Sequence, residues 1–296
     1  MFERMKLGRE ALAHDGLFWR RIAAWGAQSG PEWWVKYSPA FFGLAGAVLV
    51  PSARRKVVAN LRRIRGETSV LRNAVETGQT FTTYAGCLAE VLSNGSKNGR
   101  VPQAELIGRE RVLEVAALKK GIVVVTIHTG GWETVGPLFS RIGLRVMMAM
   151  EPERDPRARE LQDEARRAAG LLVAHVGGDP LDSLPLLRHL QTGGVVALQV
   201  DRLPPGIRTE SVRLLGAPGE IPLGPLRLAQ LSGAPLVPIF CAREGYRRYR
   251  LEASPPIFLP RRASRDEVHD AAQKVADAVT AFLRVHPTQW FHFGDY

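Results

Sequence analysis

Residues Gly121-Ile-Val-Val-Val-Thr-Ile-His128-Thr-Gly-Gly-Trp-Glu133 form the most informative segment of the chain. A run of β-branched residues lies between a Lys-Lys-Gly turn and a pair of glycines, which predicts a buried parallel strand. Because ligands of open α/β sheets bind at the carboxyl ends of the strands, His128 stands at a position typical of an active site. A helix that begins near Gly131 would add free N–H groups that favour an anion.

The imidazole of His128 has two interpretations, because a single histidine after a strand is more often a structural residue than a catalyst. Gly130 and Gly131 allow close approach of the backbone, for which a purely structural loop has little need. Glu133 lies within reach of His128 if the residues between them turn. A carboxylate on one ring nitrogen would leave the other nitrogen to take a proton from a hydroxyl. These features favour transfer chemistry.

From Gly121 onward, short apolar strands alternate with amphipathic helices, which predicts an α/β fold with a central, mostly parallel sheet flanked by helices. The sequence predicts one domain over residues 1–296, with a mainly helical, membrane-facing part (1–118) packed on an α/β core (119–296). Strands are expected near 121–127, 144–149, 171–176, 194–200, 210–215, 235–241 and 248–253. Helices are expected near 11–28, 53–65, 69–93, 103–119, 131–141, 155–169, 180–191, 222–232 and 264–285.

The bulk composition is that of a soluble or peripheral protein. The chain has 296 residues, of which 45% are hydrophobic, enough for a substantial core. It contains no run of the roughly 18 to 20 apolar residues that a membrane span requires, and its longest apolar segment, residues 39–51, is expected to be interfacial or buried. Cys87 and Cys241 form no disulfide or metal pattern, which favours a reducing, cytoplasmic compartment.

The charge of the chain indicates an anionic partner. The formal net charge is +11, and 33 of the 40 basic residues are arginine. In a helix over residues 53–65, Val57 and Leu61 would lie on one side and Arg55 on the other. A basic amphipathic helix is typical of an anionic membrane surface, as are the tryptophans and phenylalanines of residues 19–42. A solvated arginine-rich surface is the alternative, and no motif favours a nucleic acid.

The segment from His128 to Glu133 resembles the H-x4-D/E motif of lysophospholipid acyltransferase-like, glycerolipid acyltransferases. Its Trp-Glu ending is similar to the branch that contains the bacterial lipid A late acyltransferases and the phosphatidylinositol mannoside acyltransferase. This branch more often has asparagine where the chain has Gly131. Further blocks similar to the family follow in the same order, at residues 53–61, 193–202, 216–238 and 286–290, so that the resemblance covers roughly residues 30–292.

The resemblance implies a membrane-associated acyltransferase of lipid biosynthesis, which transfers groups other than aminoacyl groups. A fatty acyl chain would pass from acyl-carrier protein or acyl-CoA to a hydroxyl of a glycolipid, a lysophospholipid or a lipid A-type acceptor. The thioester is then a co-substrate, and no metal or other cofactor is implied. Such a protein is expected to be peripheral or monotopic on the cytoplasmic face of the inner membrane.

The same resemblance assigns roles to single residues. His128 is the general base, and Glu133 and Glu210 are two candidates to orient it, between which the sequence leaves the choice open. Asp201 and Arg202 end a second apolar strand, in a position comparable to that of His128, and are expected either to contact substrate or to form structural salt bridges with each other's neighbours. Further substrate contacts are expected at Gly130, Gly131, Trp132 and Arg154. The two glycine amides are expected to stabilise an oxyanion, and Arg154 is expected to meet a phosphate or a carrier, a surface arginine being the alternative.

Other mechanisms lack their sequence signatures. The chain has no G-x-S-x-G, P-loop, G-x-G-x-x-G, H-E-x-x-H or paired C-x-x-C pattern. Direct transfer is therefore favoured over a covalent acyl-enzyme. Two other functions stay open. One is a non-catalytic membrane-surface protein that binds lipid through its basic helix, and the other is an acyl thioesterase in which His128 activates water.

Overall fold

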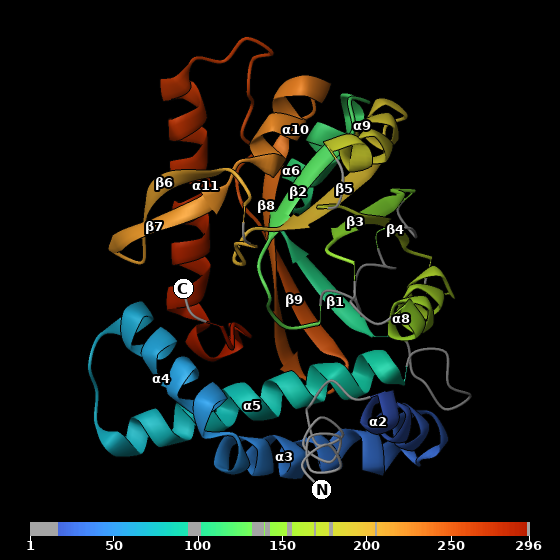
Figure 1. Ribbon diagram of the computed structural model, residues 1–296, viewed down its shortest axis with the longest axis vertical. Helices are drawn as coiled ribbons and strands as arrows, with labels where there is room; N and C mark the ends of the chain where they lie inside the picture. The colour runs from blue at the N-terminus through green and yellow to red at the C-terminus, as the bar shows by residue number, and fades with distance from the viewer. Residues whose placement is uncertain are drawn as a thin grey trace, which may run out of the picture.

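The computed structural model describes residues 17–93, 102–131, 139, 143–152, 156–168, 170–177, 180–204 and 206–294 of the chain. Within these residues the strands are β1 (Gln103–Ile107), β2 (Ile122–Thr126), β3 (Val146–Met150), β4 (Leu172–His175), β5 (Val195–Gln199), β6 (Thr209–Leu214), β7 (Ala217–Pro222), β8 (Leu236–Gly245) and β9 (Arg248–Ala253). A seven-stranded sheet has the order β1-β9-β8-β2-β5-β3-β4, with only β8 and β9 antiparallel, and β6 and β7 form a separate hairpin (Figure 1). The predicted α/β fold class is confirmed.

The helices of the described residues are α2 (Leu17–Ser29), α3 (Glu32–Leu49), α4 (Pro51–Arg65), α5 (Val70–Leu92), α6 (Arg109–Ala117), α8 (Pro156–Ala168), α9 (Leu184–Gln191), α10 (Gly224–Ser232) and α11 (Arg265–Val285). Short 3-10 helices, η1 (Pro180–Ser183) and η2 (Pro287–Gln289), precede α9 and follow α11. A capping box starts α11: the Ser264 side chain accepts from the N–H of Glu267, whose carboxylate accepts from the N–H of Ser264. At the start of α5, the Ser69 side chain likewise accepts from the N–H of Arg72, and the expected limits of α4, α5, α8 and α11 agree closely with the structure.

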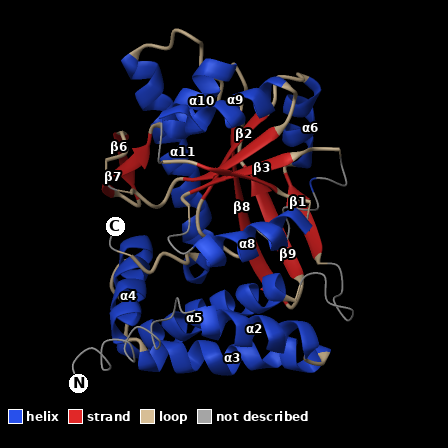
Figure 2. Cartoon of the chain, turned by 45° about the vertical axis from the view of Figure 1, so that its right-hand side comes forward, coloured by secondary structure: helices blue, strands red, loops and turns tan. Residues whose placement is uncertain are grey.

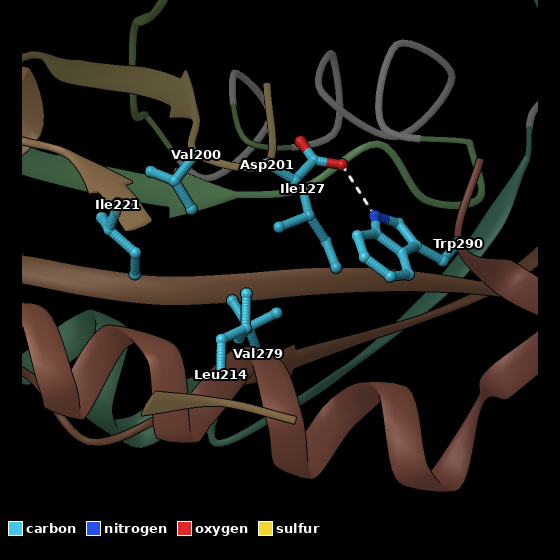
Figure 3. Close-up of a pocket in the computed structure, with 7 residues that line it drawn as sticks. All are labelled: Ile127, Val200, Asp201, Leu214, Ile221, Val279 and Trp290. Carbon is cyan, nitrogen blue, oxygen red and sulfur yellow. Dashed lines mark hydrogen bonds between the residues drawn. The ribbon is translucent and has the colours of Figure 1, made fainter. Parts of the chain in front are cut away.

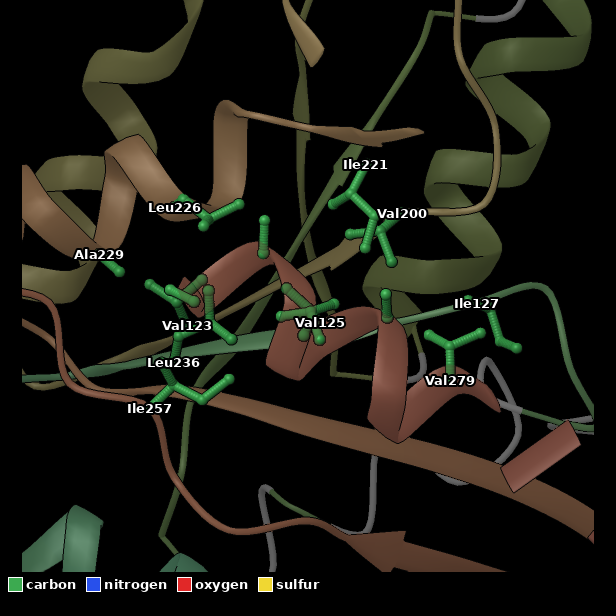
Figure 4. Packing of buried hydrophobic residues seen from close by; sticks show 14 of the residues in the cluster. Val123, Val125, Ile127, Val200, Ile221, Leu226, Ala229, Leu236, Ile257 and Val279 are labelled. Atoms are coloured by element: carbon green, nitrogen blue, oxygen red, sulfur yellow. The ribbon is translucent and has the colours of Figure 1, made fainter. Parts of the chain in front are cut away.

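Strand β2 is buried on both faces, as its β-branched run predicts. Val123, Val125 and Ile127 belong to the core cluster between the sheet and helices α10 and α11 (Figure 4). Val124 points the other way, into a cluster that includes Val112 of α6. Each such side chain contributes roughly 1.5–3 kcal/mol when fully buried. The residues that follow β2 therefore leave the sheet from a firmly packed position.

The pairing of β2 with β5 positions the site. The two strands run parallel, with Thr126 beside Gln199, and the N–H of Val200 donates to the Thr126 carbonyl at 2.9 Å. Pairing thus continues to the last residues of both strands. As a result, His128 and Asp201 leave the same carboxyl edge of the sheet next to each other.

The N-terminal helices gather at one end of the molecule, where α5 lies between α3 and the sheet (Figures 1 and 2). Helix α3 packs along α5, and the approach is so close that a β-carbon on Gly43 would collide with the backbone of Thr82. In the same part of the chain, β1 pairs with β9 as an edge strand of the main sheet. Two expectations stay predictions: that the chain forms a single domain, and that this domain divides at residue 118 into a helical part and an α/β core. No helix of the described residues is both long and apolar enough to cross a membrane.

Some expected elements differ from the structure. Residues 103–107 form β1, so the predicted helix over 103–119 is wrong in its first part, and only α6 remains of it. Pairing with β9 overrides the helix propensity of Gln103-Ala-Glu-Leu-Ile. The sequence also does not predict β7, because glycine and proline are rare inside strands. The apolar segment 39–51 lies mostly within α3, which continues through Pro39. The helix expected near 131–141 lies largely outside the described residues.

Candidate active site

The carboxyl edge of β2 and β5 brings a histidine and an aspartate together. Nδ1 of His128 lies 2.8 Å from Oδ1 of Asp201, and the backbone N–H of His128 donates to Oδ2 at 3.0 Å. The two residues are 73 positions apart in the sequence, so the pairing of the two strands creates the contact. Since one carboxylate binds both the ring and the backbone of His128, the imidazole is held in one orientation.

Asp201 is an ionised acceptor inside the protein, with 2% of its side chain exposed. Burial by itself would raise the pKa of this carboxyl. The charge of His128 and hydrogen bonds from His128 and Trp290 outweigh burial, and the pKa of Asp201 lies below its usual value. A carboxylate in this state keeps a proton on Nδ1 of His128 and leaves Nε2 as the basic nitrogen.

The imidazole of His128 differs from its partner in being accessible, with 21% of the side chain exposed. Asp201 occupies Nδ1, and in the described part of the chain Nε2 has no hydrogen-bond partner. Nε2 is thus the atom that a substrate proton can reach. The arrangement suits a general base that is oriented by a buried acid.

Residues near the C-terminus complete the site. The sequence does not predict their contribution. The indole N–H of Trp290 donates to Oδ2 of Asp201 at 2.9 Å, and the N–H of Phe291 donates to the carbonyl of His128 at 2.7 Å. The sequence shows residues 286–290 only as a block similar to the family and predicts no contact of Trp290 with the site. The available signal was Trp290 itself, because a buried tryptophan usually finds a partner for its N–H.

The predicted glycines are buried next to the pair. Gly131 has φ +71°, and a β-carbon there would collide with the ring of Tyr249. A β-carbon on Gly130 would lie 2.8 Å from both the backbone nitrogen of Arg243 and Oε1 of Gln289. Tight packing against β8 and β9 therefore explains why glycines are needed. The expected oxyanion and substrate contacts of the two amides stay predictions.

One expectation about a carboxylate is corrected. Glu210 does not orient His128 in this structure, because its Oε1 lies 3.0 Å from Nδ1 of His269 in α11 and Asp201 already occupies Nδ1 of His128. Asp201 is the buried partner of His128, whereas Arg202 is exposed, and the expected substrate contacts of both residues stay predictions. Trp132, Glu133 and Arg154 lie outside the described residues, so their roles stay predictions.

A mostly apolar contact zone, too tight to admit a water molecule, lies beside the carboxylate of Asp201. Its lining comes from the ends of β2 and β5, from the β6–β7 hairpin, from α11 and from the C-terminus (Figure 3): Ile127, Val200, Asp201, Leu214, Ile221, Val279 and Trp290. Apolar walls on this side strengthen the hydrogen bonds of the carboxylate. Among the described residues, no group of three or more His, Cys, Asp or Glu side chains is placed to hold a metal ion.

Comparison with known proteins places the chain among acyltransferase sequences. The sequence model of the family described as "Bacterial lipid A biosynthesis acyltransferase" matches residues 16–295. Two curated relatives, each named "Phosphatidylinositol mannoside acyltransferase" and from two strains of Mycobacterium tuberculosis, are 26% and 27% identical over 178 and 179 residues. The matched region is 59% of this chain and 54% of each relative, so the chain spans about half the length of these relatives.

Proposed function

The chain belongs to the bacterial lipid A biosynthesis acyltransferase family, and we propose that it is an O-acyltransferase that moves a fatty acyl chain from a thioester to a lipid hydroxyl. The observation that carries this proposal is the His128–Asp201 pair. A buried carboxylate on Nδ1 and an accessible Nε2 are what proton removal from a hydroxyl requires. The donor is acyl-carrier protein or acyl-CoA.

The proposed reaction needs one base and no covalent intermediate on the protein. Nε2 of His128 takes the proton of the acceptor hydroxyl while the oxygen attacks the thioester carbonyl. The tetrahedral intermediate collapses, the new ester forms and the carbon–sulfur bond breaks. The departing thiolate takes the proton back from His128 as a thiol. Positioned acid–base catalysis of this kind contributes about 10²- to 10⁴-fold in rate, and Asp201 stabilises the imidazolium that forms between the two proton transfers.

The comparisons support a proposal for the class of lipid that accepts the acyl chain. The family description names lipid A, and the names of the two relatives point to a phosphatidylinositol mannoside. Both are glycolipids with several hydroxyls and anionic groups. We therefore propose a glycolipid or lipid A-type acceptor. The net charge of +11 supports an anionic one.

Docking on a membrane surface is part of the proposal, on the cytoplasmic face of the inner membrane. Along α3, the side chains of Trp33, Tyr37 and Phe41 follow each other at four-residue spacing and stay exposed at 62%, 62% and 70%. Such an apolar row on a helix is typical of a surface that meets lipid or another protein. The next helix, α4, carries five arginines and one lysine in its fifteen residues, which favours an anionic lipid surface.

The activity is tested by offering the purified protein acyl-carrier-protein and acyl-CoA thioesters with the polar lipids of its host. Products are identified by mass spectrometry, with His128→Ala in parallel. A lipid that gains one acyl chain only with the wild-type protein supports the proposal, and its mass identifies the acceptor. Free fatty acid as the only product would instead indicate a thioesterase. No product from a folded protein that binds liposomes would favour the non-catalytic lipid-binding function.

Membrane docking is tested by sedimentation with anionic and with neutral vesicles. Phe41→Asp should weaken binding to anionic vesicles. Leu231→Asp is the control, because Leu231 is another exposed apolar residue (63%, against 70% for Phe41) and lies on α10, outside α3. Equal loss in both variants, or none in Phe41→Asp, contradicts docking through α3. Binding should also weaken as salt rises, because salt screens the attraction of the basic residues to the lipid.

A further inference from the structure

The C-terminal strap, which we define as residues 289–292, passes directly behind the catalytic pair. The indole N–H of Trp290 donates to Oδ2 of Asp201 at 2.9 Å, although the two residues are 89 positions apart (Figure 3). The next residue, Phe291, donates its backbone N–H to the carbonyl of His128 at 2.7 Å. The strap thus binds both members of the pair.

The strap is itself fixed at both ends. The side-chain amide of Gln289 donates to the carbonyl of Arg243 at 2.8 Å and accepts from the N–H of Arg243 at 3.0 Å, which attaches the strap to β8. At the other end, Asn60 of α4 donates to the carbonyl of His292 at 2.7 Å. With anchors on both sides, the indole of Trp290 has little freedom to leave the carboxylate.

This arrangement gives the two oxygens of Asp201 different tasks. Oδ2 accepts from the indole and from the backbone of His128, and Oδ1 faces the ring nitrogen Nδ1. His292 is a further titratable group near this carboxylate, with its Nδ1 4.0 Å from Oδ2. Because 2% of Trp290 is exposed, bulk water does not compete with its N–H for Oδ2.

We propose that Trp290 is a positioning residue for the transfer reaction: its indole N–H fixes Oδ2 of Asp201, so that Oδ1 holds the ring of His128 with Nε2 toward the acceptor. This inference rests on the proposed function of the pair. The hydrogen bond also draws charge from the carboxylate, which weakens the attraction of Asp201 for a protonated ring. Trp290 therefore sets both the direction and the strength of the base.

The test variant is Trp290→Phe, which keeps an aromatic ring and removes the donor. We expect kcat to fall about three- to tenfold, the scale of one ordinary hydrogen bond, with little change in KM. The acid limb of the kcat/KM profile should move to higher pH, because a carboxylate without this donor binds a protonated imidazole more tightly. A purely structural role would lower stability without moving the limb.

Phe291→Leu is the matched control. It disturbs packing in the same strap, where Phe291 meets the ring of Tyr84, but it keeps the indole and the backbone N–H of residue 291. We expect lower stability and an unmoved acid limb. An acid limb that stays in place in Trp290→Phe, or that moves equally in Phe291→Leu, overturns the positioning role.

A second measurement does not depend on the folding of Trp290→Phe. In protein labelled with ¹⁵N-tryptophan, one of the six indole N–H resonances should move upfield in Asp201→Asn, because a neutral amide is a weaker acceptor than a carboxylate. Six unmoved resonances would overturn the inference. If the wild-type protein acylates no lipid, both the proposed function and the positioning role are overturned. If the wild-type protein transfers acyl chains but the acid limb does not move in Trp290→Phe, only the positioning role is overturned.

Discussion

Two histidine–carboxylate pairs in this chain are nearly identical in geometry and opposite in environment. Nδ1 lies 2.8 Å from the carboxylate oxygen in His128–Asp201 and 3.0 Å from it in His269–Glu210. The exposed fraction of the acid is 2% in the first pair and 18% in the second, and that of the ring is 21% and 48%. The distance between ring and acid therefore does not distinguish the two pairs, whereas the burial of the acid does.

The burial difference has a direct physical consequence. A buried carboxylate cannot exchange its partners for water, so Asp201 keeps one geometry and acts in a medium where its charge is felt strongly. An ion pair near the surface contributes only about 0–1 kcal/mol and is screened by salt. The first pair lies at the carboxyl edge of two buried parallel strands, where ligands bind. The second joins the β6–β7 hairpin to α11 and needs no further role.

The largest difference between the pairs should appear when each histidine is replaced by glutamine. His128→Gln should lower acyl transfer by about 10²- to 10⁴-fold, because Nε2 is the proposed base. His269→Gln should leave transfer within about twofold of wild type, on the scale of an exposed pair. The measurement is product formation with saturating thioester. Comparable losses in both variants would remove the distinction on which the mechanism is built.

Replacing the acids should give a smaller but still clear difference. Asp201→Asn should lower kcat by about 10- to 100-fold, because a neutral amide neither holds the proton on Nδ1 nor stabilises the imidazolium. Glu210→Gln should have little effect. Glu133→Gln sharpens the comparison, since Glu133 is the other acid that the sequence offers as a partner of His128. A loss in Glu133→Gln larger than that in Asp201→Asn would return the orienting role to Glu133.

The position of His128 at the carboxyl end of a buried strand could be predicted from the sequence because its signals are local. The β-branched run before His128 predicts a buried strand, and ligands bind at the carboxyl ends of such strands. Asp201 is likewise visible as the end of a second apolar strand. The neighbour relation is not visible, because it depends on β5 lying beside β2 in the order β8-β2-β5. Without that order, the sequence offers Glu133 and Glu210 as partners of His128, and Asp201 is not among them.

The remainder of the site depends on contacts that no local pattern reports. Trp290 reaches Asp201 across 89 residues, and its sequence context, after the last helix, resembles ordinary packing at the end of a domain. Likewise β1 owes its extended form to pairing with β9, more than 140 residues later in the chain. In both cases tertiary contact overrides the local preference. The fold class needs only periodicity, whereas these details need the register of the sheet.

The two acids should also differ in their contribution to stability. Asp201→Asn should lower the free energy of unfolding by about 1.5–3 kcal/mol, the range for buried hydrogen bonds to a charged group. Glu210→Gln should cost less than about 1 kcal/mol. Denaturant unfolding at neutral pH and constant salt measures both values. An equal loss of unfolding free energy in the two variants would mean that the burial of Asp201 does not make its pair more stabilising than the exposed pair.

The smallest expected effect concerns how the contribution of Asp201 depends on pH. The pKa of Asp201 in the folded protein lies below its usual value of 3.8, despite burial, because of His128 and the hydrogen bonds from His128 and Trp290. A group whose folded pKa is lowered stabilises the fold above its unfolded pKa, and this contribution disappears as the pH falls through the folded pKa. The difference in unfolding free energy between wild type and Asp201→Asn should therefore be full at neutral pH and shrink below about pH 4. Glu210→Gln, measured over the same range, shows what the loss of a less buried carboxylate does. A difference for Asp201→Asn that stays constant on acidification would mean that shape, and not charge, is what the buried acid contributes.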